Sequence, residues 1–192
     1  MGQNLMESDI AKYLYEIGLL KRVKRSGWWI AGIDDPESVA EHSFRTAIIA
    51  YILGQLEGVD PERVALMALF HDVGETRISD LHRIAQRYLN RKEVDQKVMK
   101  EQLEKLPDEV ASHLKSLFSE MEDPSSIEAK VAHDADILEC LLQAREYQAL
   151  GYGDVADWIS NCQAALSTDS AKSIANGCIK VQPRDWWQGL KA

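Results

Sequence analysis

Long apolar runs are missing from this chain of 192 residues. No apolar stretch approaches the roughly 20 residues that a membrane-spanning helix needs, so we expect no transmembrane segment. The N-terminal sequence MGQNLMESD lacks the basic start and apolar block of a secretory signal. Cysteine is scarce: Cys140, Cys162 and Cys178 are odd in number and widely spaced, which favours reduced thiols over a disulfide framework. We therefore expect a cytoplasmic protein with no membrane partner.

Positive charge is also in short supply. The chain carries 22 Lys and Arg against 31 Asp and Glu, a formal net charge of −9. This balance opposes binding to a nucleic-acid polymer, whose phosphates are neutralised by basic residues. A small phosphorylated ligand remains compatible, because one basic cluster can hold it inside an acidic protein. Lys21, Arg22, Lys24 and Arg25 form such a cluster, although a basic helix end that complements the helix dipole is the simpler explanation.

Strand patterns and chain-dividing linkers are absent as well. No segment alternates convincingly between apolar and polar residues, and no Pro/Gly/Ser-rich run interrupts the sequence. Apolar residues instead recur at spacings of three and four, which predicts helices nearly throughout. With 45% hydrophobic residues, the chain is long enough to bury one core, and no internal repeat is visible. We expect one all-α domain over residues 1–192, with helices over 8–22, 38–58, 60–72, 91–105, 107–122, 126–150, about 154–166 and about 168–180.

Helix-start signals support these boundaries. Ser38 and Glu41 have the spacing of a capping box, and Asp60 followed by Pro61 is a cap residue before proline at the first helical position. Ser8 or Asp9 is a suitable cap for the first helix. The Gly-, Asp- and Pro-rich stretch between residues 25 and 38 predicts a loop.

Histidines and acids gather in three segments with helix-like surroundings. They are SVAEHSF with His42, ALFHDVGETRISD with His71 and Asp72, and HDAD at 133–136. In a helix, adjacent side chains project about 100° apart, so His71 and Asp72 share one cation only if partners arrive from neighbouring helices. Imidazoles and carboxylates on separate segments predict a site for one divalent metal with open coordination positions.

Further acids lie close to the adjacent pair. Glu75 follows His71 by four residues and Asp72 by three, and Asp80 comes after a short turn-like stretch. Such a concentration of acids after the apolar run ALMALF is hard to explain as packing, because carboxylates are rarely buried without a partner. The remaining histidines, by contrast, have the simpler explanation of isolated structural side chains: His82, His113 and His133.

Four blocks in order resemble a known family. The H…HD…D pattern is similar to the HD-domain metal-dependent phosphohydrolase superfamily, and most of all to its 5′-deoxynucleotidase branch. The matching blocks are LLKRVKRSGW at 19–28, PESVAEHSFR at 36–45, ALFHDVGETRISD at 68–80 and DILECLLQAREY at 136–147. They span most of residues 19–150, whereas the C-terminal helices over 154–192 add nothing specific. The resemblance implies a single-domain HD-domain helical bundle that hydrolyses deoxyribonucleoside 5′-monophosphates to deoxyribonucleoside and phosphate.

The resemblance also implies a ligand set. It selects His42, His71, Asp72 and Asp136 as metal ligands, with Glu139 and Gln143 completing the last block. Helical periodicity points instead to Asp134, which is in register with the apolar positions of its helix. We follow the resemblance, and Asp134 remains the alternative. A mixed nitrogen and oxygen set accepts several ions; the resemblance favours Co²⁺ or Mn²⁺, with Ni²⁺, Fe²⁺, Zn²⁺ or Mg²⁺ as alternatives.

Roles for four more residues follow from the resemblance. Glu75 and Asp80 match family acids that orient or deprotonate water and protonate the leaving oxygen, and the sequence does not divide these tasks between them. Arg25 matches a phosphate-binding arginine, and Trp28 is expected either to contact the sugar or base or to anchor the core. Family members often form homodimers, so we expect one here.

Two other functions compete with this interpretation. One is a different HD hydrolase that acts on a deoxynucleoside triphosphate, a cyclic nucleotide or an alarmone. The other is a metal-bound nucleotide sensor without catalysis. Acids such as Glu75 and Asp80 beside the ligands argue for catalysis.

Overall fold

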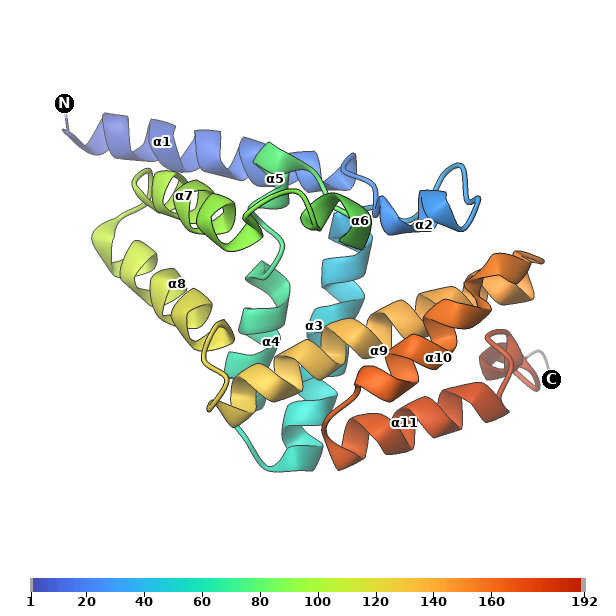
Figure 1. Ribbon diagram of the computed structural model, residues 1–192. Coiled ribbons are helices and arrows are strands. Elements are labelled where there is room, and N and C mark those ends of the chain that lie inside the picture. The colour runs from blue at the N-terminus through green and yellow to red at the C-terminus, as the bar shows by residue number, and fades with distance from the viewer. Residues whose placement is uncertain (1, 191–192) are drawn as a thin grey trace.

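The computed structural model describes residues 2–190, and in that range it contains helices and no strand (Figure 1). The all-α prediction is therefore confirmed. The longer helices carry the architecture, and several short ones shape the connections. In chain order the elements are α1 (Gly2–Ile17), η1 (Gly18–Lys21), α2 (Gly27–Ile30), α3 (Val39–Glu57), α4 (Pro61–Phe70), α5 (Glu75–Ile78), α6 (Arg83–Gln86), α7 (Arg91–Leu103), α8 (Asp108–Met121), α9 (Ile127–Ala149), η2 (Gly153–Val155), α10 (Ala156–Ala165), α11 (Asp169–Lys180) and η3 (Asp185–Trp187).

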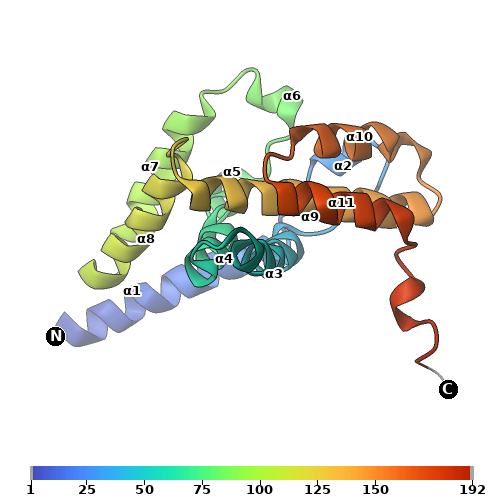
Figure 2. The same cartoon turned by 90° about the horizontal axis from the view of Figure 1, so that it is seen from below.

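Helix α9 is the centre of the bundle. It has 23 residues and packs against α3 and α4 on one side and against α10 and α11 on another (Figures 1 and 2). Leu138 and Leu141 of α9 are almost completely buried and belong to the main core together with Leu53 and Met67. Because several helices cover α9, its polar residues are buried against different neighbours as well.

The start of α3 is fixed by the predicted capping box. Ser38 Oγ accepts a hydrogen bond from the Glu41 backbone at 3.2 Å, and Glu41 Oε2 accepts one from the Ser38 backbone at 2.6 Å. The next helix begins as predicted too, since Asp60 accepts hydrogen bonds from two backbone N–H groups just after Pro61. These caps set the register that turns His42 into the interior.

Helices α3 and α4 approach each other closely where the chain reverses. A Cβ added at Gly54 would lie 2.8 Å from the Pro61 Cα atom, closer than packed atoms tolerate. Gly58 ends α3 at a φ of 72°, a conformation that glycine adopts without strain. Glycine at these two positions lets the helices pair tightly and carries the chain into α4.

Three sequence-based expectations were wrong in detail. The first helix begins at Gly2, so Ser8 and Asp9 lie inside it; the preceding residues include good helix formers that extend the helix. Helix α4 ends at Phe70, and the pair His71 and Asp72 therefore lies at a helix end and in the following turn. The loop before α3 contains the short helix α2. Among the described residues, no helix combines the length and apolar character needed to span a bilayer.

Candidate metal centre

Three elements bring the predicted metal ligands together. His42 comes from α3, His71 and Asp72 from the turn after α4, and Asp136 from α9. His42 Nε2 lies 3.1 Å from Asp136 Oδ1 and 3.8 Å from Asp72 Oδ2. His71 Nε2 lies 3.0 Å from Asp72 Oδ2 and 3.9 Å from Asp136 Oδ1. Ligand atoms of His42, His71 and Asp72 thus lie within 4.8 Å of one another, and Asp136 contacts both histidines.

His71 shows that a cation fits there. Its Nδ1 donates to the Ala68 carbonyl oxygen at 2.6 Å, so Nε2 is the ring nitrogen that faces the acids. That Nε2 atom is buried and has no hydrogen-bond partner among the described residues, although Asp72 Oδ2 lies only 3.0 Å away. A nitrogen and a carboxylate oxygen this close need a positive charge between them, which either a proton on Nε2 or a bound metal ion supplies. Ligand atoms bound to one ion at about 2.1 Å lie roughly 3.0–3.4 Å apart, close to the separations found here.

The opposite edge of the His42 ring is held by a second carboxylate. His42 Nδ1 contacts Glu139 Oε2 at 2.6 Å, and both side chains are buried. Arg45 Nε donates to Glu139 Oε1 at 2.9 Å, and the same guanidinium reaches Gln143 and Glu146 at 2.7 Å each. A carboxylate on the far nitrogen fixes the tautomer of a metal-binding histidine and raises its basicity.

Sequence reasoning did not find Arg45. A signal was present, because Arg45 follows His42 by three residues and its partners recur at helical spacing along α9. Recognising the pairing required knowledge that α3 lies against α9. The two helices are therefore joined through polar groups directly behind the candidate centre.

The pKa values of the centre show a site that holds positive charge. Burial and Arg25 act to lower the pKa of His42, yet hydrogen bonds to Asp136 and Glu139 outweigh them and raise it to about 10. Burial likewise acts to raise the pKa of the Asp136 carboxyl, but the contacts with His42, His71 and Arg25 hold it well below its usual range. In the absence of a metal, protons and Arg25 supply the positive charge that these acids attract.

Arg25 lies beside the ligands rather than at an exposed helix end. Its guanidinium is 3.4 Å from Asp72 Oδ2, 3.8 Å from Asp80 Oδ1 and 3.9 Å from Asp136 Oδ1. The charges of these three acids raise its pKa against the opposing effect of burial, so the cation is permanent. The structure thus places Arg25 next to the centre, where the resemblance had located a phosphate-binding group.

Glu75 is the acid with a free oxygen. Its side chain is buried, Oε1 is 3.3 Å from an Arg91 nitrogen, and Oε2 has no partner among the described residues. Burial, followed by the charges of Asp72 and Asp80, raises the pKa of Glu75 to about 9. An unpartnered buried carboxyl oxygen is costly, and a water or substrate atom is the group that satisfies it.

Asp80 is fixed in place by its neighbours. One carboxylate oxygen accepts a hydrogen bond from the Ser26 backbone, and Ser26 Oγ donates to the Asp80 carbonyl oxygen at 2.9 Å. The preceding residue, Ser79, has φ 61° and ψ 166°, a region that residues other than glycine rarely occupy. This strain of about 1–3 kcal/mol is characteristic of functional sites. The strained turn directs Asp80 toward Arg25.

Two other residues named from the sequence lie outside this cluster. Trp28 is 2% exposed and packs against Tyr147 and Trp158, while its Nε1 donates to Glu37 at 3.0 Å; this position favours the core-anchor interpretation. Asp134 faces the start of α11 and accepts hydrogen bonds from the backbone and hydroxyl groups of Ser167 and Thr168. Its partners are therefore not Arg or Lys side chains, as the sequence had suggested for a structural role.

The remaining histidines stay apart from the ligands. His82 accepts a hydrogen bond from the Ala85 backbone at the start of α6, and His133 contacts the Met121 carbonyl oxygen at 3.1 Å. Both take the isolated structural roles expected for them. Among the histidines in residues 2–190, His42 and His71 are the two that face the acids of the centre.

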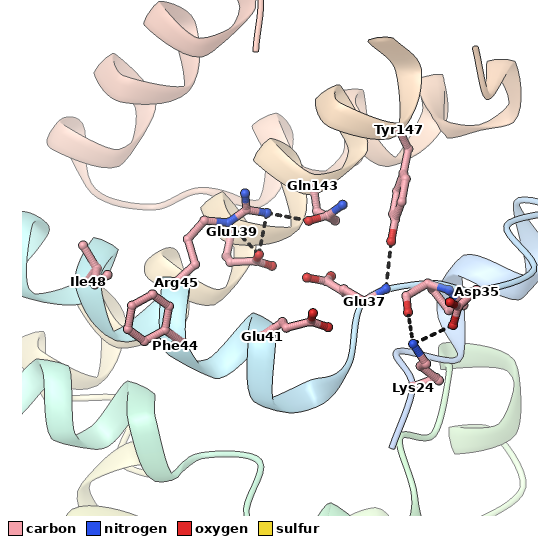
Figure 3. Close-up of a pocket in the computed structure, with 11 residues that line it drawn as sticks. Lys24, Asp35, Glu37, Glu41, Phe44, Arg45, Ile48, Glu139, Gln143 and Tyr147 are labelled. Carbon is pink, nitrogen blue, oxygen red and sulfur yellow. Dashed lines mark hydrogen bonds and ion pairs between the residues drawn. The ribbon is translucent and has the colours of Figure 1, made fainter. Parts of the chain in front are cut away.

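A cavity of about 760 Å³ lies behind the His42–Glu139 pair, between α3 and α9 (Figure 3). From α3, the apolar side chains of Phe44 and Ile48 line the cavity together with Arg45. From α9, the lining residues are Glu139, Gln143 and Tyr147. Glu37 also lines it; burial and the nearby charge of Glu139 raise the Glu37 pKa to about 7. Glu139 thus connects the cavity with the candidate centre.

Comparisons with known proteins agree with this geometry. A model of the HD domain matches residues 17–176. The human protein 5′-deoxynucleotidase HDDC2 is 33% identical over 145 residues, which cover 74% of this chain and 70% of that protein. A 5′-deoxynucleotidase of Schizosaccharomyces pombe is 31% identical, with 73% of each chain covered. Among solved structures, a conserved hypothetical protein from Pyrococcus furiosus is 30% identical and covers 89% of this chain and 99% of its own, with a TM-score of 0.76.

Proposed function

Because this chain belongs to the HD-domain family, we propose that it is a metal-dependent 5′-deoxynucleotidase. It would hydrolyse deoxyribonucleoside 5′-monophosphates to deoxyribonucleoside and phosphate, the activity given in the names of its eukaryotic relatives. The observation that carries the proposal is the convergence of two imidazoles and two carboxylates on one point beside a permanent cation. Metal and phosphate sites side by side are the requirement for phosphomonoester hydrolysis.

His42, His71, Asp72 and Asp136 would hold the metal. When bound there, a divalent cation supplies a water of lowered pKa and offsets negative charge on the phosphoryl group. The hydrogen bond from His71 Nδ1 to Ala68 directs Nε2 at the acids, and a metal that displaces the proton from Nε2 would find a nitrogen lone pair there. We propose Co²⁺ or Mn²⁺ as the physiological ion, since two nitrogen and two oxygen ligands suit such metals.

Arg25 would bind the phosphate. Its contacts with the surrounding acids are 3.4–3.9 Å long, whereas strong charge-assisted hydrogen bonds are about 2.7–2.9 Å. The guanidinium therefore has donors available for a better acceptor. A phosphate group offers several oxygens in the geometry that this planar fork matches.

Glu75 would exchange a proton with the attacking water or the leaving 5′-oxygen, and Asp80 would position the substrate. The buried carboxyl of Glu75 retains its proton at neutral pH in the metal-free chain, because its pKa is about 9. Its free Oε2 can hydrogen-bond to a water or to the leaving 5′-oxygen. Asp80 is already fixed by Ser26, which favours a role in orientation.

Phosphate release from a panel of nucleotides tests the proposal. The protein is loaded with Mn²⁺ and given deoxyribonucleoside and ribonucleoside monophosphates, nucleoside triphosphates and cyclic nucleotides. We expect release from the deoxyribonucleoside monophosphates above all, its loss on chelation, and at least about a 100-fold lower kcat for Glu75→Gln. Glu101→Gln, which alters an exposed acid of α7, is the matched control and should retain activity. Nucleotide binding without phosphate release would show a sensor instead, and preferred release from another class would show a different HD hydrolase.

The cellular setting is part of the proposal. All three cysteines are free thiols, which suits a reducing compartment, and we propose the cytoplasm. We also propose that the chain works as a homodimer.

A further inference from the structure

One face of helix α7 carries two charged residues followed by two buried ones. Arg91, Asp95, Val98 and Gln102 recur at spacings of four, three and four, so they share one side of the helix. We refer to these four residues as the α7 face. Val98 and Gln102 are 7% and 2% exposed. Charged residues in line with such buried positions are unusual unless they have partners there.

The buried half of the α7 face fixes α7 to the segment that carries Glu75. Gln102 Nε2 donates to Thr76 Oγ1 at 3.0 Å, directly after Glu75 in the chain. A Cβ added at Gly74 would lie 3.5 Å from Val98 Cγ1, an ordinary contact distance, so the backbone before Glu75 lies against α7 as well. Helix α7 is therefore in contact with the residues on both sides of Glu75.

The charged half of the α7 face reaches the Glu75 carboxyl itself. Arg91 Nη2 donates to Glu75 Oε1 at 3.3 Å, and among the described residues no other side chain hydrogen-bonds to this carboxyl. Glu75 opens α5, which has only four residues and gives its side chain little support. Because Arg91 occupies Oε1, the unpartnered Oε2 is the oxygen left for a reacting group.

Arg91 is fixed more firmly than the other arginine near the centre. Its Nε atom donates to both carboxylate oxygens of Asp95, at 2.8 Å and 2.6 Å, within the range of strong charge-assisted hydrogen bonds. The contacts of Arg25 with its acids, by contrast, are 3.4–3.9 Å long. Arg25 therefore has donors available for a ligand, whereas the guanidinium of Arg91 is held between Asp95 and Glu75.

We propose that Arg91, held by Asp95, is a positioning residue that orients the Glu75 carboxyl for proton exchange in the reaction. This role rests on the proposed phosphatase function and adds a residue to its machinery. Arg91 acts through Glu75 and does not bind the substrate. Without it, Glu75 Oε1 loses its hydrogen bond and the carboxyl can rotate away, and a displacement of about 1 Å in a reacting group costs roughly 100-fold in rate.

Steady-state kinetics of the Mn²⁺-loaded protein on a deoxyribonucleoside monophosphate test this role. Arg91→Met keeps a long side chain but removes the donors, and it should lower kcat about 10–100-fold. KM should change by less than about threefold, because a contact needed only in the transition state lowers kcat and kcat/KM equally. Arg91→Lys, which keeps a cation beside Glu75, should have a kcat at least about fivefold above that of Arg91→Met.

Lys92→Met is the matched control. It removes the positive charge of the next residue, which is exposed and pairs with Glu122 at 3.1 Å. Its kcat and KM should equal those of the wild type. Circular dichroism and Mn²⁺ affinity should match the wild type in every variant, since Arg91 contacts none of the four metal ligands among its recorded hydrogen bonds and ion pairs.

A double-mutant cycle tests whether Arg91 acts through Glu75. Once Glu75→Gln has removed the acid, Arg91 has no carboxyl to orient, so adding Arg91→Met should cost less than about a further twofold in kcat. A further loss of about tenfold or more in that background, or a raised KM with unchanged kcat in Arg91→Met alone, would overturn the proposal and indicate direct substrate binding.

The remaining outcomes separate this role from the proposed function. Wild-type kcat in Arg91→Met would overturn the positioning role and leave the phosphatase function intact. Loss of the fold in Arg91→Met, with no recovery of kcat in a folded Arg91→Lys, would overturn it in favour of a structural role. A wild-type protein that releases no phosphate from any nucleotide would overturn the proposed function, and the role of Arg91 with it.

Discussion

Glu139→Gln separates the positioning of a metal ligand from the stability of the bundle. The carboxylate of Glu139 accepts a short hydrogen bond from His42 Nδ1 at 2.6 Å in a fully buried environment. Glutamine keeps the volume and one oxygen acceptor but removes the charge. His42 remains in place while its Nε2 becomes a weaker donor to the metal.

The size of the effect follows from the geometry. Charge-assisted hydrogen bonds are roughly twice as strong as neutral ones, and loss of a partner behind a metal-binding histidine typically costs 10–100-fold in metal affinity. That range corresponds to about 1.4–2.8 kcal/mol. Arg45 keeps its contacts with Gln143 and Glu146, so the guanidinium is not left without partners. We therefore expect a large change in metal affinity and a smaller loss of fold stability.

Competition with a chelating dye measures the Mn²⁺ affinity of each variant. Glu146→Gln is the matched control, because Glu146 bonds to the same Arg45 at 2.7 Å but does not contact His42. Glu139→Gln should bind Mn²⁺ about 10–100-fold more weakly, and Glu146→Gln should differ from wild type by less than about twofold. Equal affinities for wild type and Glu139→Gln, or an equal loss in both variants, would refute the reasoning.

Three further perturbations address other parts of the structure. Asp136→Asn should abolish tight Mn²⁺ binding, whereas Asp134→Asn should lower only the thermal stability, by about 1–3 kcal/mol, because Asp134 serves the start of α11. The Glu16 carboxylate, held mainly by its hydrogen bond to Arg77, has a pKa of about 2 against the ordinary 4.5. After reduction by solvent screening, the ionised carboxylate therefore contributes about 1–2 kcal/mol to the free energy of unfolding. This contribution is present above pH 4.5 and is lost as the pH falls toward 2. Glu16→Gln should remove this part of the pH dependence of unfolding. Gly54→Ala should destabilise the fold by about 1–3 kcal/mol in urea unfolding, since the new methyl group meets α4.

Each of these three predictions would be contradicted by a specific result. Weak Mn²⁺ binding by Asp134→Asn together with normal binding by Asp136→Asn would reverse the ligand assignment. A Glu16→Gln variant whose acid unfolding curve parallels that of wild type would show that the ion pair contributes nothing. Gly177→Ala, where a Cβ meets open space in α11, is the steric control and should be neutral or stabilising, so an equal loss in both glycine variants would exclude the steric explanation.

Local signals predicted the parts of the fold that depend on neighbouring residues. The capping box at Ser38 and Glu41 and the Asp60–Pro61 start act within one helical turn, and both are present. The predicted start of the first helix was wrong, because the residues before Ser8 are themselves helical. A capping residue marks a helix start only where the preceding residues cannot continue the helix.

The fourth ligand shows the limit of periodicity. Asp134 is in register with the apolar face of α9 and is indeed buried, but it faces α11. Asp136, on another side of the same helix, faces His42. Periodicity assumes one buried face, whereas α9 is covered by α3 and α4 on one side and by α10 and α11 on another. The resemblance pointed to Asp136 because it carried information about which helices meet.

Long-range polar contacts could not be predicted from the sequence for the same reason. Arg45 and Glu139 are 94 residues apart, and Ser26 and Asp80 are 54 apart. The strained backbone at Ser79 gives no compositional signal, because serine ordinarily avoids that conformation. These features depend on how helices pack, which local propensities do not encode.

Joint measurement of bound metal and activity tests the central claim most directly. Chains are loaded with increasing Mn²⁺, the bound ion is quantified by mass spectrometry of the metal, and phosphate release from a deoxyribonucleoside monophosphate is measured on the same samples. We expect one ion per chain, activity in proportion to occupancy, and loss of both in His42→Ala and Asp136→Asn. Full occupancy in those two variants, or equal phosphate release with and without the ion, would contradict the account.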